Sequence, residues 1–145
     1  MLDRKFFKKL SKDVIPMYRR HIWIDEKDVN DQKFPIYSPA YAIAKKSGKL
    51  KRSAKKWRNK RSPALSGDLH NSFDLMETRT DGFKFGTPVY GARVKNLEKM
   101  GRFLSTKETP IPKKMQGFII KEAEDYIMGQ MKKDFKDKKS NVRWR

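Results

Sequence analysis

Apolar residues recur at spacings of three and four positions near the start of the chain. The spacing predicts a helix over residues 2–24 with one apolar face. Pro16 lacks a backbone donor and clashes with the preceding turn, so we expect a kink or a break there. The pattern continues into Ile22-Trp23-Ile24, which favours a core helix over one lying on a membrane surface. Its apolar positions are Phe6, Leu10, Val14, Met17 and Tyr18.

The next segment has no clear periodicity until a helix-start signal appears. Asp25 to Gln32 is acidic and polar and predicts a loop, and residues 33–37 are expected to be extended. Ser38-Pro39 is typical of an N-cap followed by proline in the first helical turn. We therefore expect a short helix that ends at Gly48.

Period-two patterning flanks Asp81-Gly82. Phe73 and Leu75 alternate with their neighbours before this dipeptide, and Phe83 and Phe85 do so after it. Aspartate followed by glycine between two such segments is a strong signal for a β-hairpin. The four residues form one apolar face of the hairpin, and that face needs a cover.

Three further helices are expected around the hairpin. A short one spans residues 66–72 with Ser66 as its cap, and another spans Val89–Met100 and ends at Gly101. The last begins after Pro112 and runs from Lys113 to about Lys136. We expect its apolar residues to form one core-facing stripe, namely Met115, Phe118, Ile119, Ala123, Tyr126, Ile127, Met131 and Phe135.

Together these elements predict an α+β fold in a single domain spanning residues 1–145. A small, mainly antiparallel sheet packs against a long N-terminal and a long C-terminal helix. The long stripe of the last helix is expected to cover the hairpin. A basic loop at about residues 45–62 and a basic tail at about residues 137–145 stand outside this core.

Charge adds the strongest functional signal. The 145 residues include 36 Lys and Arg against 17 Asp and Glu, for a formal net charge of +19. Such a balance favours contact with polyanions or with acidic protein surfaces. Cysteine is absent, and no apolar run approaches the roughly 18 residues of a membrane span. We expect a soluble, unsecreted protein.

The excess charge is concentrated in two arms. Residues 45–61 contain ten Lys or Arg and no acid, and such self-repulsion favours an extended or mobile loop. Either this arm contacts a polyanion, with Trp57 available to stack on a base, or it is a solvated arm that becomes ordered against neighbouring chains. The candidate contact residues are Lys45, Lys46, Lys55, Lys56, Trp57, Arg58 and Arg61 in the loop, and Arg143 and Arg145 in the tail.

No catalytic or metal-binding constellation emerges from the residue types. His21 is preceded by two arginines, and His70 has no second histidine or cysteine at ligand spacing. Ser66-Gly67-Asp68 lacks the second glycine and the preceding strand of a nucleophile elbow. The acidic residues are scattered rather than paired. We expect a protein that is not an enzyme and uses neither cofactor nor metal.

Two short motifs stand on either side of the hairpin. The first is Leu65-Ser66-Gly67-Asp68-Leu69-His70-Asn71-Ser72, and the second is Gly86-Thr87-Pro88-Val89-Tyr90-Gly91. With the later Gly101-Arg102 and Pro110-Ile111-Pro112-Lys113 steps, their order resembles the bacteriophage virion-morphogenesis family of small tail-completion or head–tail connector proteins. The resemblance covers roughly residues 34–135.

This resemblance implies a structural subunit of a phage neck or tail. Such a subunit would assemble into a homo-oligomeric ring in the host cytoplasm and reside in the virion. Its partners would be other neck, tail or portal proteins, with non-specific contact to packaged DNA and none to a membrane. Composition alone leaves open a basic nucleic-acid-binding protein, and more weakly a small nuclease or toxin.

Overall fold

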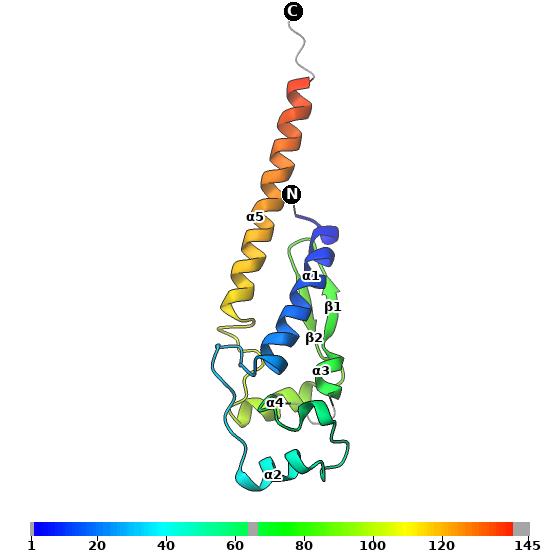
Figure 1. The fold of residues 1–145 in the computed structure, drawn as a ribbon. Coiled ribbons are helices and arrows are strands. Elements are labelled where there is room, and N and C mark those ends of the chain that lie inside the picture. The colour runs from blue at the N-terminus through cyan, green and yellow to red at the C-terminus, as the bar shows by residue number, and fades with distance from the viewer. Residues whose placement is uncertain (1, 64–66, 141–145) are drawn as a thin grey trace, which may run out of the picture.

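The computed structural model describes residues 2–63 and 67–140 and confirms the α+β fold, with 54% of the chain helical. In Figure 1, α1 runs along the β1–β2 hairpin with α5 beside them, and α5 projects past the N-terminal end of α1. The elements in chain order are α1 (Arg4–Arg19), the π-helical turn η1 (Arg20–Ile24), α2 (Pro39–Ser47), the 3₁₀ turn η2 (Lys55–Trp57), α3 (Asp68–Ser72), β1 (Asp74–Thr78), β2 (Phe83–Gly86), α4 (Gly91–Lys99) and α5 (Lys113–Ser140).

Helix α1 begins at a side-chain cap and continues through its proline. The Asp3 carboxylate accepts a hydrogen bond from the Phe6 backbone N–H at 2.8 Å. The break expected as one outcome at Pro16 does not occur, because the α-helix extends to Arg19. The backbone instead widens into the π-helical turn η1 four residues later. This turn buries three consecutive side chains, those of His21, Ile22 and Trp23.

The predicted hairpin is confirmed. Strands β1 and β2 pair antiparallel, with Leu75 opposite Phe85 and Thr78 opposite Phe83, and the pairing shifts by one residue around Met76. The Arg79 N–H donates to the Gly82 carbonyl at 2.8 Å and closes the turn. A bulge of this kind increases local twist, which suits a two-stranded ribbon wrapped on a single helix.

Helix α1, rather than α5, covers the hairpin. The predicted direct cover by the last helix is wrong in this respect, because α1 packs on both strands and α5 packs on α1. Phe83 and Phe85 reach the buried α1 residues Phe6, Phe7, Leu10 and Val14. From the α5 side, the Tyr126 ring lies 4.7 Å from that of Phe6. Helix α1 therefore meets both the hairpin and α5 through one broad apolar face, whereas Lys5, Lys9 and Lys12 on its opposite face are exposed.

A second cluster of buried residues joins distant parts of the chain. Its centre is formed by the rings of Tyr18, Trp23 and Phe73, with centroids 5.3 to 6.3 Å apart. The Tyr18 hydroxyl donates to the Leu104 carbonyl at 2.6 Å, which ties α1 to the segment between α4 and α5. Phe85 packs against this cluster and against the α1 cluster, so the two are continuous.

Helix α5 carries two apolar faces, so the prediction of a single stripe is wrong. Phe118, Ile119 and Tyr126 pack toward α1, as expected of core residues, and Ile127 is half-buried. At 3.6 residues per turn, Met131 lies about 140° around the helix from Tyr126. Met131 and Phe135 are 64% and 71% exposed. We call Ile120, Met128, Met131 and Phe135 the outer face of α5.

Replacing Tyr18 by phenylalanine tests the link between α1 and the segment after α4. The ring packing is kept, but the hydroxyl is lost and the buried Leu104 carbonyl is left without its donor. We expect the free energy of unfolding to fall by about 1–3 kcal/mol, measured by urea denaturation. Tyr41→Phe, at an exposed position, is the control and should cost less than about 0.5 kcal/mol. Equal effects of the two changes would contradict the assigned role of the Tyr18 hydroxyl.

Candidate functional site

The basic segment folds into a lobe, which we define as residues 36–63. The expectation of an extended loop at residues 45–61 is wrong. Helix α2 begins at Ser38, whose hydroxyl accepts from the Tyr41 N–H, and ends at Gly48 in the left-handed region (φ 74°), as predicted. The turn η2 follows at Lys55–Trp57. In Figure 1, α2 lies at the end of the molecule opposite to the projecting part of α5.

Lys45 stabilises this lobe from within. Its side chain is 1% exposed, and its ammonium donates to the carbonyls of Lys60 at 2.6 Å and Ser62 at 3.3 Å. The same nitrogen lies 4.7 Å from the centre of the Tyr37 ring, and the Arg102 guanidinium carbon lies 4.0 Å from that centre. Lys45 therefore holds the chain together and is not available to an external partner.

Trp57 is also a core residue. It is 4% exposed, and its ring centroid lies 5.2 Å from that of His70. Gly67 adopts φ 90°, and a Cβ added there would come within 2.8 Å of Trp57 Nε1. This close approach gives the glycine of the first motif a packing role. The proposal that Trp57 stacks on a nucleic-acid base is wrong for this conformation.

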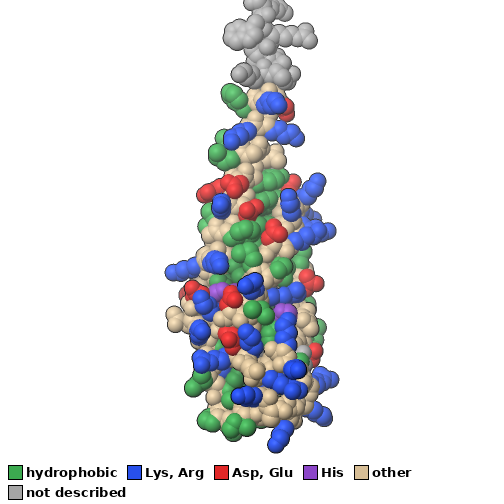
Figure 2. Space-filling view, in the orientation of Figure 1, with side chains coloured by type: hydrophobic (Ala, Val, Ile, Leu, Met, Phe, Trp, Pro, Cys, Tyr) green, Lys and Arg blue, Asp and Glu red, His purple; other side chains and the backbone are tan. Residues whose placement is uncertain are grey.

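The remaining predicted contact residues differ in exposure. Lys46, Lys55, Lys56 and Arg61 are exposed. Arg58 is half-buried over Gly48, where an added Cβ would lie 2.5 Å from its Cζ. Figure 2 shows Lys and Arg side chains spread along the whole visible face. Arg143 and Arg145 lie outside the described residues, as do Leu65 and the predicted cap Ser66. Within the described chain, Gly67 precedes α3 as its N-cap.

A groove that the sequence did not predict lies between the lobe and helices α3 and α4. Its volume is about 730 Å³. One wall comes from the start of α2 and the turn at residues 51–52, and the other from α3, α4 and the residue after Gly101. The lining residues are Ile36, Tyr37, Ser38, Tyr41, Lys51, Arg52, Pro63, Gly67, Asp68, Leu69, Arg93, Asn96, Leu97, Met100 and Arg102.

Arg102 is the most constrained cation of this groove. It is 3% exposed, its Nη2 donates to the Pro35 carbonyl at 2.7 Å, and its buried Nε has no hydrogen-bond partner among the described residues. Burial raises the pKa of the neighbouring Tyr37 phenol, although the Arg102 charge acts in the opposite direction. Burial and, secondarily, the Arg102 charge lower the pKa of Lys45 to about 8. The side chains of Tyr37, Lys45 and Arg102 thus lie close together beneath the groove.

The residues of the two resembling motifs meet in space. The hydroxyls of Ser72 and Thr87 lie 2.7 Å apart, and Thr87 Oγ1 accepts from the Tyr90 N–H at 3.2 Å. These hydrogen bonds join the end of α3 to the segment that precedes α4. The motifs therefore build the hairpin base and position the α4 wall of the groove.

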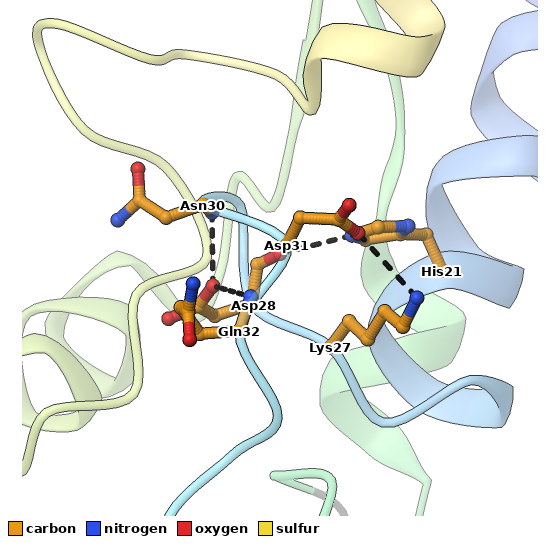
Figure 3. A network of polar contacts seen from close by, with 6 residues as sticks. All are labelled: His21, Lys27, Asp28, Asn30, Asp31 and Gln32. Atoms are coloured by element: carbon orange, nitrogen blue, oxygen red, sulfur yellow. Dashed lines mark hydrogen bonds and ion pairs between the residues drawn. The ribbon is translucent and has the colours of Figure 1, made fainter.

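The acidic loop after η1 is a structural unit rather than a reactive site (Figure 3). The Asp28 Oδ1 accepts from the backbone N–H groups of Asn30 and Gln32, both at 2.9 Å. His21 Nε2 lies 2.9 Å from the Asp28 carbonyl oxygen and 3.8 Å from Asp31 Oδ1. His70 packs edge-on against Trp23, and its burial lowers its pKa. Both histidines are thus engaged in packing or loop contacts.

Residues 2–63 and 67–140 contain no group of three or more His, Cys, Asp or Glu side chains placed to hold a metal ion. None of the helices in these ranges is long and apolar enough to cross a membrane.

Comparison with known proteins likewise gives no match, whether to family models, to curated proteins or to solved structures.

The buried amine of Lys45 predicts a specific pH dependence of stability. Its pKa in the folded state, about 8, lies below the ordinary value of 10.5. Between these values the unfolded chain binds more protons, so the contribution of Lys45 to the free energy of unfolding rises with pH. We expect the stability difference between wild type and Lys45→Met to grow as pH increases from about 8 to about 10.5, measured by urea denaturation.

Lys46→Met, one position along α2 and exposed, controls for the loss of a positive charge. A wild-type advantage over Lys45→Met that stays constant or shrinks across this pH window would contradict the assignment.

Proposed function

We propose that the chain is a non-enzymatic structural subunit of a phage neck or tail, a tail-completion or head–tail connector protein that assembles into a homo-oligomeric ring. The observation that carries the proposal is the outer face of α5, whose four apolar side chains are 55–71% exposed. Exposed apolar residues on a projecting helix are typical of a protein interface. The order of the two motifs resembles the virion-morphogenesis family, and this resemblance supports an interface between subunits of a phage neck or tail.

The projecting part of α5 needs a neighbour for energetic reasons. Isolated helices of fewer than about 12–15 residues are marginal in water, and α5 extends beyond α1 without support in this region (Figure 1). Burial of each large apolar side chain contributes roughly 1.5–3 kcal/mol. A second copy that covers the outer face would stabilise the helix and join the subunits. In the virion, the remaining partners are neck, tail or portal proteins.

Paired substitutions on α5 test the proposed subunit contact. Met131→Ser with Phe135→Ser removes two side chains of the outer face. We expect the wild type to form an oligomer and this variant to be monomeric, with the dissociation constant raised more than about 10-fold. Sedimentation velocity and native mass spectrometry measure the assembly state. Mass spectrometry of purified particles should also find the chain in the virion.

The matched control is Lys133→Ser with Lys136→Ser, which changes α5 at positions roughly 140–200° around the helix from Met131. This variant introduces the same number of serines into the same segment of α5, at a helix-propensity cost no smaller than that of the test variant, and should remain oligomeric. A monomeric wild type, or equal dissociation in both variants, would contradict self-assembly through the outer face. Absence of the chain from purified particles would contradict the virion assignment.

A nucleic-acid-binding protein is the second candidate function. It is favoured by the net charge of +19 and by the exposed Lys46, Lys55, Lys56 and Arg61 of the lobe. In the connector proposal the same surface contacts DNA passing through the neck or an acidic neighbouring subunit. Dependence of DNA affinity on salt separates a localised DNA site from a diffuse attraction, because each neutralised phosphate contributes a slope of about −0.9 on a log–log plot.

Replacing Lys46, Lys55, Lys56 and Arg61 by glutamine tests this candidate. If the lobe is the DNA site, the salt slope should lose roughly one unit per contact removed, as measured by fluorescence anisotropy with duplex DNA. The control replaces Lys5, Lys8, Lys9 and Lys12, four exposed cations of α1, by glutamine. The same loss of slope in both variants would show a diffuse attraction and would count against a nucleic-acid site in the lobe.

A further inference from the structure

We propose that the groove between α2, α3 and α4 binds an acidic, extended peptide segment of a partner protein, anchored by one bulky apolar side chain. The inference rests on the groove alone and does not depend on self-assembly through α5. Its volume of about 730 Å³ falls within the range of roughly 300–1,000 Å³ found for ligand pockets.

The apolar part of the lining defines the anchor. Ile36 and Tyr41 lie on the α2 side, and Leu97 and Met100 lie on the α4 side. Ile36 and Met100 are 71% and 59% exposed, although both border a hollow in which a single large side chain would cover them. The Tyr37 and Tyr41 rings, with centroids 4.7 Å apart, add a flat aromatic surface. An aromatic or long aliphatic side chain fits these walls.

The charges of the lining define the rest of the occupant. Lys51, Arg52, Arg93 and Arg102 border the groove, whereas Asp68 is its one lining carboxylate and lies 3.8 Å from Arg52. The Arg93 guanidinium is held 4.3 Å above the Tyr90 ring, so one exposed cation of the groove is already positioned. Arg102 is 3% exposed and contributes its charge from beneath the groove. Carboxylates flanking the anchor would complement this excess of positive charge.

The two densest acidic stretches of the chain are already part of its own fold. Asp25 to Asp31 belongs to the folded loop of Figure 3, and Glu122 to Asp125 lies within α5. The residues outside the described ranges, 1, 64–66 and 141–145, contain no acid. A nucleic-acid strand would match the cations but not the exposed Ile36 and Met100. The combination of cations and exposed apolar residues in the lining therefore points to a segment of a different protein.

Fluorescence anisotropy with designed peptides tests this proposal. The probe is a labelled peptide of glutamates with one central phenylalanine. One comparison peptide has serine in place of the phenylalanine, and another has glutamines in place of the glutamates. We expect the probe to bind the full-length protein, and both comparison peptides to bind at least about 10-fold more weakly. An unlabelled single-stranded oligonucleotide serves as the competitor.

Two substitutions on the same helix locate the binding. Arg93→Gln removes a groove cation and should weaken probe binding about 10-fold, whereas Lys95→Gln removes an exposed α4 cation outside the lining and should change it less than twofold. Met100→Ser should abolish the preference for phenylalanine over serine. Each of four results would overturn the proposal. The probe could fail to bind at millimolar concentration, or the serine peptide could bind as tightly as the probe. Arg93→Gln and Lys95→Gln could have equal effects, or the oligonucleotide could compete more strongly than unlabelled probe.

Discussion

The fold depends on one broad apolar face of α1, which packs against both the hairpin and α5. A two-stranded hairpin is at best marginally stable by itself in water, and β1–β2 gains its stability by laying Phe83 and Phe85 on α1. The N-terminal half of α5 needs the same helix, through contacts such as that of Tyr126 with Phe6. The π-helical turn then inserts Ile22 and Trp23 into the second cluster, which holds the groove-bearing end of the molecule. Removing α1 would leave no common core.

The basic lobe shows how a segment dense in like charges can still fold. Repulsion among the cations is reduced where their side chains enter the structure as hydrogen-bond donors. Lys45 donates to two carbonyls of its own lobe, and Arg102 donates to a third at Pro35. Buried cations are costly unless such partners satisfy them, and the lowered pKa of Lys45 records this cost. Lys46, Lys55, Lys56 and Arg61 are exposed and retain their hydration.

The two surfaces on which the proposals rest differ in chemistry and in place. The outer face of α5 is apolar and lies on the projecting helix, whereas the groove is cationic at its rim and lies beside α2 and α4 (Figure 1). Contacts between unlike patches on neighbouring subunits can close into rings. In these proposals the outer face of α5 binds a like subunit and the groove binds an acidic partner. A protein with two such surfaces would lie between two parts of a larger assembly.

The sequence by itself determined the local elements. The capping serine and the left-handed glycine delimit α2, Asp81-Gly82 marks the hairpin turn, and Gly101 ends α4, because each signal acts through residues close in the chain. Only the tertiary structure decided which faces are covered. It placed α1 rather than α5 on the hairpin, divided the apolar residues of α5 between two faces, and buried Lys45 and Trp57. The groove joins residues 36–41 to residues 93–102 and has no local signal. Burial is set by contacts between segments far apart in the chain. The number of charges therefore does not indicate that the Lys45 ammonium donates to carbonyls fifteen and seventeen residues away.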